Sequence, residues 1–204
     1  MTWRNAFTTH FTRRNETMSA RLNLPNTLTW IRIVLIPLIV VVFYLPHPWS
    51  GPVAAIIFSL AGITDWLDGY FARKLNQTSA FGAFLDPVAD KLMISTALVL
   101  LVSKYPGFVV AIPAAVIIGR EIAVSALREW MSELGGRQHV SVSGIGKYKT
   151  TAQITALIMM LWGQKLWFIP MYEIGYGFLL LAALLTLWSM GKYLMAAWPH
   201  LRGY

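Results

Sequence analysis

The sequence has no cysteine and little charge. Without cysteine, the chain forms no disulfide bond, no thiolate metal site and no cysteine nucleophile. Only 13% of the 204 residues are charged and 56% are hydrophobic, whereas an average soluble chain is about 25% charged. The four histidines are scattered, with no metal-ligand spacing between any two, which argues against a zinc site. This composition favours a single membrane domain over a water-soluble one.

The hydrophobic residues fall into six runs of about the length that crosses a membrane. We expect six transmembrane helices, at roughly residues 28–45, 52–70, 85–103, 108–128, 148–164 and 171–191. The expected fold is therefore an all-α integral membrane protein, built as a six-transmembrane-helix bundle.

Lysine and arginine are distributed unevenly around these runs. Twelve of the 17 basic residues lie in the termini and in the loops that would share their side of the membrane. The loops of the opposite side hold only Lys104 and Lys165. By the positive-inside rule, we expect both termini in the cytoplasm. The net charge of +8 does not indicate a nucleic-acid partner, because the basic residues form no patch interleaved with aromatic side chains.

Residues 1–23 precede the first expected membrane helix. Trp3, Phe7 and Phe11 recur every four residues among arginines, a pattern typical of a short amphipathic helix that lies on an anionic membrane surface. A disordered extension is the alternative. We therefore divide the chain into an N-terminal extension, residues 1–23, and a membrane domain, residues 24–204.

The chain has only four aspartates, and they lie within 26 residues, at Asp65, Asp68, Asp86 and Asp90. Carboxylates beside hydrocarbon are costly and usually mark a functional site. Spacings of three and four residues place each pair on one face of a helix, and facing pairs would form an all-oxygen site suited to Mg²⁺ and substrate phosphates. The alternative is a solvated loop whose acids pair with Arg73, Lys74 and Lys91. Pro87 fits either a helix start or a kink.

The aspartates stand in a longer pattern, Asp65-x-x-Asp68-Gly69-x-x-Ala72-Arg73, eight residues, then Gly82-x-x-x-Asp86-x-x-x-Asp90. This pattern resembles the complete signature of the CDP-alcohol phosphotransferase family. The resemblance implies a membrane enzyme in which the hydroxyl of an alcohol attacks the phosphorus of a CDP-alcohol and CMP leaves. Four segments extend the resemblance to a bacterial branch that joins CDP-diacylglycerol to sn-glycerol 3-phosphate. They are Pro25–Ile33, Phe81–Met93, Arg120–Met131 and Gly146–Gln153.

The resemblance also implies a metal site and roles for the residues of the pattern. Two Mg²⁺ ions, with Mn²⁺ as the alternative, would be held by Asp65, Asp68, Asp86 and Asp90. Asp90 would also be the catalytic base that deprotonates the acceptor. A role as ligand alone is the alternative, because a metal-bound carboxylate is a poor base. Arg73 would approach the donor phosphates, and Gly69, Ala72 and Gly82 would leave room for the nucleotide.

Other polar residues on the expected cytoplasmic side are candidates for substrate binding. The donor candidates are Asn26, Thr29 and Arg32. Arg120 lies inside an apolar run, where an unpaired guanidinium is costly. The alternative is an ion pair with Glu121 or with a glutamate elsewhere. We do not expect Glu121 simply to neutralise Arg120, because adjacent helical residues point about 100° apart. With Lys147 and Lys149, Arg120 would hold the phosphate of sn-glycerol 3-phosphate or of another phosphorylated polyol.

The closer resemblance implies a homodimer surrounded by lipid in the bacterial inner membrane, with a cytoplasmic active site. Within the family, other acceptors such as inositol phosphate and phosphatidylglycerol stay open. Two other classes also use carboxylates near a membrane. An aromatic prenyltransferase would carry two separate aspartate motifs and more spans than this chain. A divalent-cation transporter would hold its site near the bilayer midplane, at a repeat interface.

Overall fold

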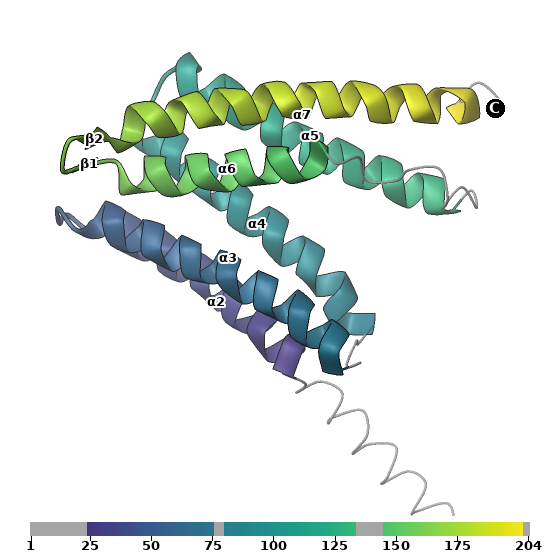
Figure 1. Cartoon of the computed structure of the whole chain (residues 1–204), viewed down its shortest axis with the longest axis horizontal. Helices are drawn as coiled ribbons and strands as arrows, with labels where there is room; N and C mark the ends of the chain where they lie inside the picture. The colour runs from purple at the N-terminus through teal and green to yellow at the C-terminus, as the bar shows by residue number, and fades with distance from the viewer. Residues whose placement is uncertain (1–23, 76–79, 134–144, 202–204) are drawn as a thin grey trace, which may run out of the picture. The chain divides into compact units, whose positions relative to one another are not determined.

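The computed structural model of the protein describes residues 24–75, 80–133 and 145–201 (Figure 1). The predicted amphipathic segment, residues 1–23, lies outside the described residues. Six helices occupy the described ranges, namely α2 (Leu24–Phe43), α3 (Ser50–Leu75), α4 (Ala80–Lys104), α5 (Phe108–Glu133), α6 (Ile145–Trp162) and α7 (Met171–Leu201). Each predicted membrane helix falls on one of them. The helical fold class is therefore confirmed for the part of the chain that the structure describes.

Two of the helices are long and apolar enough to cross a membrane, judged by length and composition. They are α5, over Phe108–Trp130, and α7, over Met171–Met195. Shorter apolar stretches lie in α2, at Thr29–Phe43, and in α3, at Ser50–Asp65. The stretch in α3 stops at Asp65, where the aspartate pattern begins. The count of six membrane spans stays a prediction.

The chain forms two compact units. In the described residues, the first unit comprises 24–41, 57–75 and 80–93, which are parts of α2, α3 and α4. Its buried apolar side chains include Ile39, Phe58 and Ala89. This unit contains all four aspartates of the motif.

The second unit comprises residues 42–56, 94–133 and 145–201 of the described chain. In it, α7 packs against both α5 and α6. A short antiparallel hairpin of β1 (Lys165–Leu166) and β2 (Ile169–Pro170) joins α6 to α7. The two helices are therefore antiparallel neighbours (Figure 1).

Gly175 sets the register between α6 and α7. A Cβ atom on Gly175 would lie 2.8 Å from Met159 Cβ and 2.9 Å from Met160 Cγ, so only glycine permits this close approach of the two backbones. Because the helices are antiparallel and rise equally per residue, the same register brings Thr186 of α7 level with Lys149 of α6. These two polar residues of the second unit thus lie at the same level along the helix axes.

Pro87 lies inside α4, which begins seven residues earlier, at Ala80. Its interpretation as a helix start was therefore wrong. Residues 80–85, which are mostly apolar, form the first part of this helix ahead of the predicted membrane span. Asp86 and Asp90 still lie one turn apart, as their spacing predicted.

Candidate active site

The aspartates of the first unit lie on two helices. Asp65 and Asp68 lie in the last part of α3, and Asp86 and Asp90 lie in the first part of α4. The helical geometry that their spacing predicted is thus confirmed. The side chain of Asp68 lies outside the described residues, so the contacts of the site are those of the other three.

Arg32 of α2 connects the two aspartate-bearing helices. Its Nη2 atom lies 2.9 Å from Asp65 Oδ1, and its Nη1 atom donates a 2.8 Å hydrogen bond to Asp90 Oδ1. The guanidinium is fully buried, while the side chains of Asp65 and Asp90 are 42% and 39% exposed. One planar guanidinium therefore contacts the first and last carboxylates of the motif and leaves part of each accessible.

Thr29 makes the corresponding contact with a third aspartate. It lies three residues before Arg32 on α2, and its hydroxyl donates a 2.5 Å hydrogen bond to Asp86 Oδ1. Thr29 is buried. Thr29 and Arg32 were predicted as donor-binding residues from sequence. In the structure they lie against the aspartates, so both fix the orientation of carboxylates in the motif.

The residues of the first unit fit a hard divalent cation by their chemistry. The carboxylates supply oxygen ligands, which Mg²⁺ and Mn²⁺ prefer. Because Asp65 and Asp90 both contact the guanidinium of Arg32, these two carboxylates lie close enough to share one cation. Within the described side chains, no three acidic or histidine groups are arranged closely enough to hold a metal ion. The side chain of Asp68 is not one of these described side chains.

Several predicted site residues have no described side chain. They are Asn26, Asp68, Gly69, Ala72, Arg73, Gly82 and Lys147. Their backbones continue the helices α2, α3, α4 and α6. Their proposed contacts with substrate or metal stay predictions.

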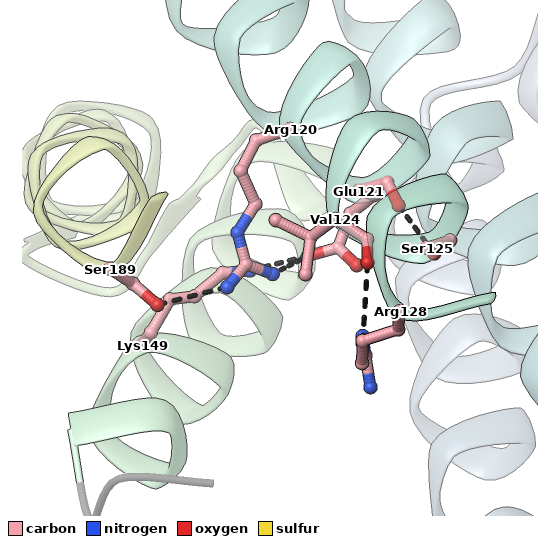
Figure 2. A network of polar contacts seen from close by, with 7 residues as sticks. All are labelled: Arg120, Glu121, Val124, Ser125, Arg128, Lys149 and Ser189. Atoms are coloured by element: carbon pink, nitrogen blue, oxygen red, sulfur yellow. Dashed lines mark hydrogen bonds and ion pairs between the residues drawn. The ribbon is translucent and has the colours of Figure 1, made fainter. Parts of the chain in front are cut away.

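The second unit contains a separate cluster of polar side chains (Figure 2). Arg120 of α5 is only 8% exposed. Its Nη2 atom donates a 2.9 Å hydrogen bond to Ser189 Oγ of α7, and its guanidinium carbon lies 5.6 Å from the ring centre of Tyr193. Sequence reasoning did not select Ser189. The only available signal was a serine inside an apolar helix.

Glu121 binds two of the three predicted acceptor cations. Its Oε1 atom accepts hydrogen bonds from Lys149 Nζ and, at 3.1 Å, from Arg120 Nη1 (Figure 2). The expectation that Glu121 would not pair with Arg120 was wrong. Adjacent Cβ atoms do point apart, but the long arginine side chain returns its guanidinium to the neighbouring carboxylate. Two buried cations share one carboxylate, so this group of three carries an excess positive charge.

The described chain is helical, two of its helices are long and apolar enough to cross a membrane, and an acidic motif lies on two helices. The model of the CDP-alcohol phosphatidyltransferase family matches residues 22–198. The chain therefore belongs to the CDP-alcohol phosphatidyltransferase family. Members of this family are membrane enzymes that generally use a divalent metal.

Curated bacterial proteins are similar over most of the chain. A relative from Salmonella choleraesuis (strain SC-B67) is 53% identical over 177 residues, which are 87% of this chain and 96% of the relative. Relatives from Shigella flexneri serotype 5b (strain 8401) and Escherichia coli (strain K12) are each 52% identical over the same length. All three are named CDP-diacylglycerol--glycerol-3-phosphate 3-phosphatidyltransferase.

Proposed function

We propose that this protein transfers the phosphatidyl group of CDP-diacylglycerol to sn-glycerol 3-phosphate, giving phosphatidylglycerophosphate and CMP. The observation that carries the proposal is the 53% identity to the Salmonella protein over 96% of its length, because that protein is named for this reaction. The buried cations could bind the acceptor's phosphate directly, and the aspartates could bind the anionic pyrophosphate of the donor through divalent cations.

In the proposed reaction, a hydroxyl oxygen of the acceptor forms a bond to the phosphorus that carries diacylglycerol. The pyrophosphate bond to CMP breaks, and CMP leaves with its electron pair. Asp90 accepts the proton of the attacking hydroxyl; if Asp90 serves only as a metal ligand, the proton passes to the phosphate of the leaving CMP or to water. Divalent cations held by Asp65, Asp68, Asp86 and Asp90 would neutralise the pyrophosphate and stabilise the leaving oxygen.

The chain's own residues would prepare this site before substrate binds. Arg32 orients Asp65 and Asp90 through its two terminal nitrogens, and Thr29 orients Asp86. Such preorganisation favours a charged transition state because little reorganisation is needed during the reaction. Contacts with the donor stay proposed for Thr29 and Arg32 and for Asn26, Gly69, Ala72, Arg73 and Gly82.

The acceptor's phosphate would bind the cations of the second unit. Arg120 and Lys149 are more than nine-tenths buried and share the single carboxylate of Glu121. An anionic group would compensate their excess charge, and guanidinium and ammonium groups both bind phosphate directly. Lys147 is proposed as the third cation. The homodimer, the inner-membrane location and the cytoplasmic side of the termini stay predictions from the sequence.

The test is release of CMP by the purified protein in lipid nanodiscs. CDP-diacylglycerol is supplied with sn-glycerol 3-phosphate, inositol phosphate, phosphatidylglycerol or serine, in Mg²⁺, in Mn²⁺ or in excess chelator. We expect CMP only with metal, and fastest with sn-glycerol 3-phosphate. Faster release with inositol phosphate would reassign the acceptor, and no release with any acceptor would reject the family reaction for this chain.

The metal assignment has its own test. Asp65→Asn, Asp68→Asn and Asp86→Asn should each abolish CMP release while the protein still accumulates in the membrane, because each removes a charged oxygen ligand. Asp90→Asn should lose the chemical step and retain part of its donor binding. Wild-type CMP release by any of the first three variants would reject the metal assignment.

A further inference from the structure

The second unit buries more polar groups than its internal hydrogen bonds use. Five polar or charged side chains from α5, α6 and α7 are more than nine-tenths buried there: Arg120, Lys149, Gln153, Thr186 and Ser189. Gln153 is 2% exposed and Thr186 is fully buried. In the part of the chain that the structure describes, Gln153 Nε2 and Thr186 Oγ1 have no hydrogen-bond partner. A buried polar atom without a partner is costly. We therefore expect a bound ligand to supply hydrogen-bond partners for these two atoms.

Both residues lie beside the cation pair. Gln153 follows Lys149 by four residues on α6, and Thr186 precedes Ser189 by three residues on α7, so each lies on the face of its helix that carries the polar cluster. The register set by Gly175 brings Thr186 level with Lys149. Helical side chains lean toward the N-terminus of their own helix. Because α6 and α7 are antiparallel, Gln153 and Thr186 lean toward each other.

The chemistry of these groups differs from that of the cations. An amide nitrogen only donates hydrogen bonds, whereas a threonine hydroxyl both donates and accepts. Together they match a single hydroxyl group, which would accept from Gln153 and donate to Thr186. Neither residue carries a charge, so they do not form a second phosphate site. A ligand with a phosphate and a nearby hydroxyl, a phosphorylated polyol, fits the whole cluster.

We propose that Gln153 and Thr186 bind the hydroxyl of the acceptor that does not react. This inference rests on the proposed function, and it assigns the residues that select a polyol phosphate over a simple hydroxyalkyl phosphate. In sn-glycerol 3-phosphate the primary hydroxyl attacks the donor, so Gln153 and Thr186 would bind the secondary hydroxyl. Arg120 and Lys149 would bind the phosphate of the same molecule.

The experiment compares two acceptors that differ only in that hydroxyl: sn-glycerol 3-phosphate and 3-hydroxypropyl phosphate. The wild-type protein should prefer sn-glycerol 3-phosphate in kcat/KM by about tenfold to a hundredfold, as expected for two hydrogen bonds to one group. Gln153→Leu and Thr186→Val nearly preserve the side-chain volumes and remove the polar atoms. Each should reduce the preference about threefold to tenfold by slowing the reaction of sn-glycerol 3-phosphate alone.

A structural role for these residues gives a different result. It would lower kcat/KM for both acceptors together, and this would overturn the inference. Thr151→Val, which removes an exposed hydroxyl from α6, is the matched control and should keep the wild-type preference. If Gln153→Leu or Thr186→Val does not accumulate, Gln153→Asn and Thr186→Ser, which retain the polar groups, take their place. Thr186→Ser should keep the wild-type preference for sn-glycerol 3-phosphate.

The wild-type protein alone also tests the inference. Equal use of the two acceptors would overturn it without affecting the proposed function, because CMP would still be released. No release with sn-glycerol 3-phosphate would instead reject the proposed function, and this inference with it. The two failures are therefore distinguishable in one assay.

Discussion

Arg32 and Asp90 are joined by a 2.8 Å hydrogen bond although 58 residues separate them in sequence. The same guanidinium lies 2.9 Å from Asp65. A buried cation thus holds together carboxylates of two different helices. Its charge lowers the repulsion between the acids, and its planar geometry fixes where each Oδ1 atom lies. Arg32 therefore acts on the motif as a positioning residue.

Replacing Arg32 by methionine should destabilise the metal-free protein. The change leaves two carboxylates without their shared partner, and we expect a loss near the lower end of the about 3 to 5 kcal/mol typical of a broken buried pair, because the acids are two-fifths exposed. Thermal unfolding in detergent with chelator measures the loss. Added Mg²⁺ should then raise Tm less in Arg32→Met than in wild type, because carboxylates that have lost their positioning partner bind the metal more weakly. An equal rise in both proteins would contradict the positioning role, and Arg128→Met is the control.

Thr29→Val should weaken the use of metal while keeping the volume of the side chain. The variant removes the hydrogen bond to Asp86, and bonds to charged groups are worth about 1.5 to 3 kcal/mol, or roughly tenfold to a hundredfold in binding. The Mg²⁺ concentration for half-maximal CMP release should therefore rise. Thr29→Ser retains the hydroxyl and should restore the wild-type value. If both variants behave alike, the hydroxyl does not position Asp86.

Much of the fold followed from the sequence because the apolar runs are long and well separated. Each run became one helix, but the helix ends differ from the predicted ones. α3 continues to Leu75 and α4 begins at Ala80, beyond the ends of the predicted membrane spans. Hydropathy marks where a helix meets lipid, whereas the helix itself continues through the polar residues of the aspartate motif.

From the sequence, we could predict only those features of the site that depend on the spacing of residues within one helix. Intervals of three and four residues placed the aspartates correctly on two helices. The contacts of Arg32 depend on packing between helices distant in sequence, and no spacing rule gives them. The contact of Glu121 with Arg120 was only an alternative interpretation, because the 100° angle between adjacent residues argued against it. That angle describes Cβ directions, and a guanidinium on a flexible side chain can reach beyond it.

Glu121 should be more important for stability than another glutamate of the same helix. Glu121→Ala would leave Arg120 and Lys149 as two buried like charges that have lost their shared acceptor. Glu129→Ala removes an exposed carboxylate from α5 and is the matched control. We expect a clear fall in Tm for Glu121→Ala and little change for Glu129→Ala. Phosphate should recover part of the loss, since it can bind both cations. Equal Tm values for the two variants would reject this role.

The last prediction concerns the acceptor's phosphate. Arg120→Gln and Lys149→Gln should each raise KM for sn-glycerol 3-phosphate by about tenfold to a hundredfold, because a charge-assisted hydrogen bond contributes roughly 1.5 to 3 kcal/mol. KM for CDP-diacylglycerol should stay near the wild-type value. Steady-state CMP release with each substrate varied in turn gives both constants.

Arg128→Gln is the control for removing positive charge from α5. Arg128 is exposed and its guanidinium donates to the backbone oxygen of Val124, so its loss should leave the acceptor KM nearly unchanged. Inorganic phosphate should inhibit the wild-type protein by competing with sn-glycerol 3-phosphate, and should inhibit Arg120→Gln and Lys149→Gln less. If donor and acceptor constants rise together, or if phosphate inhibits all proteins equally, these cations stabilise the helices and the acceptor's phosphate binds elsewhere.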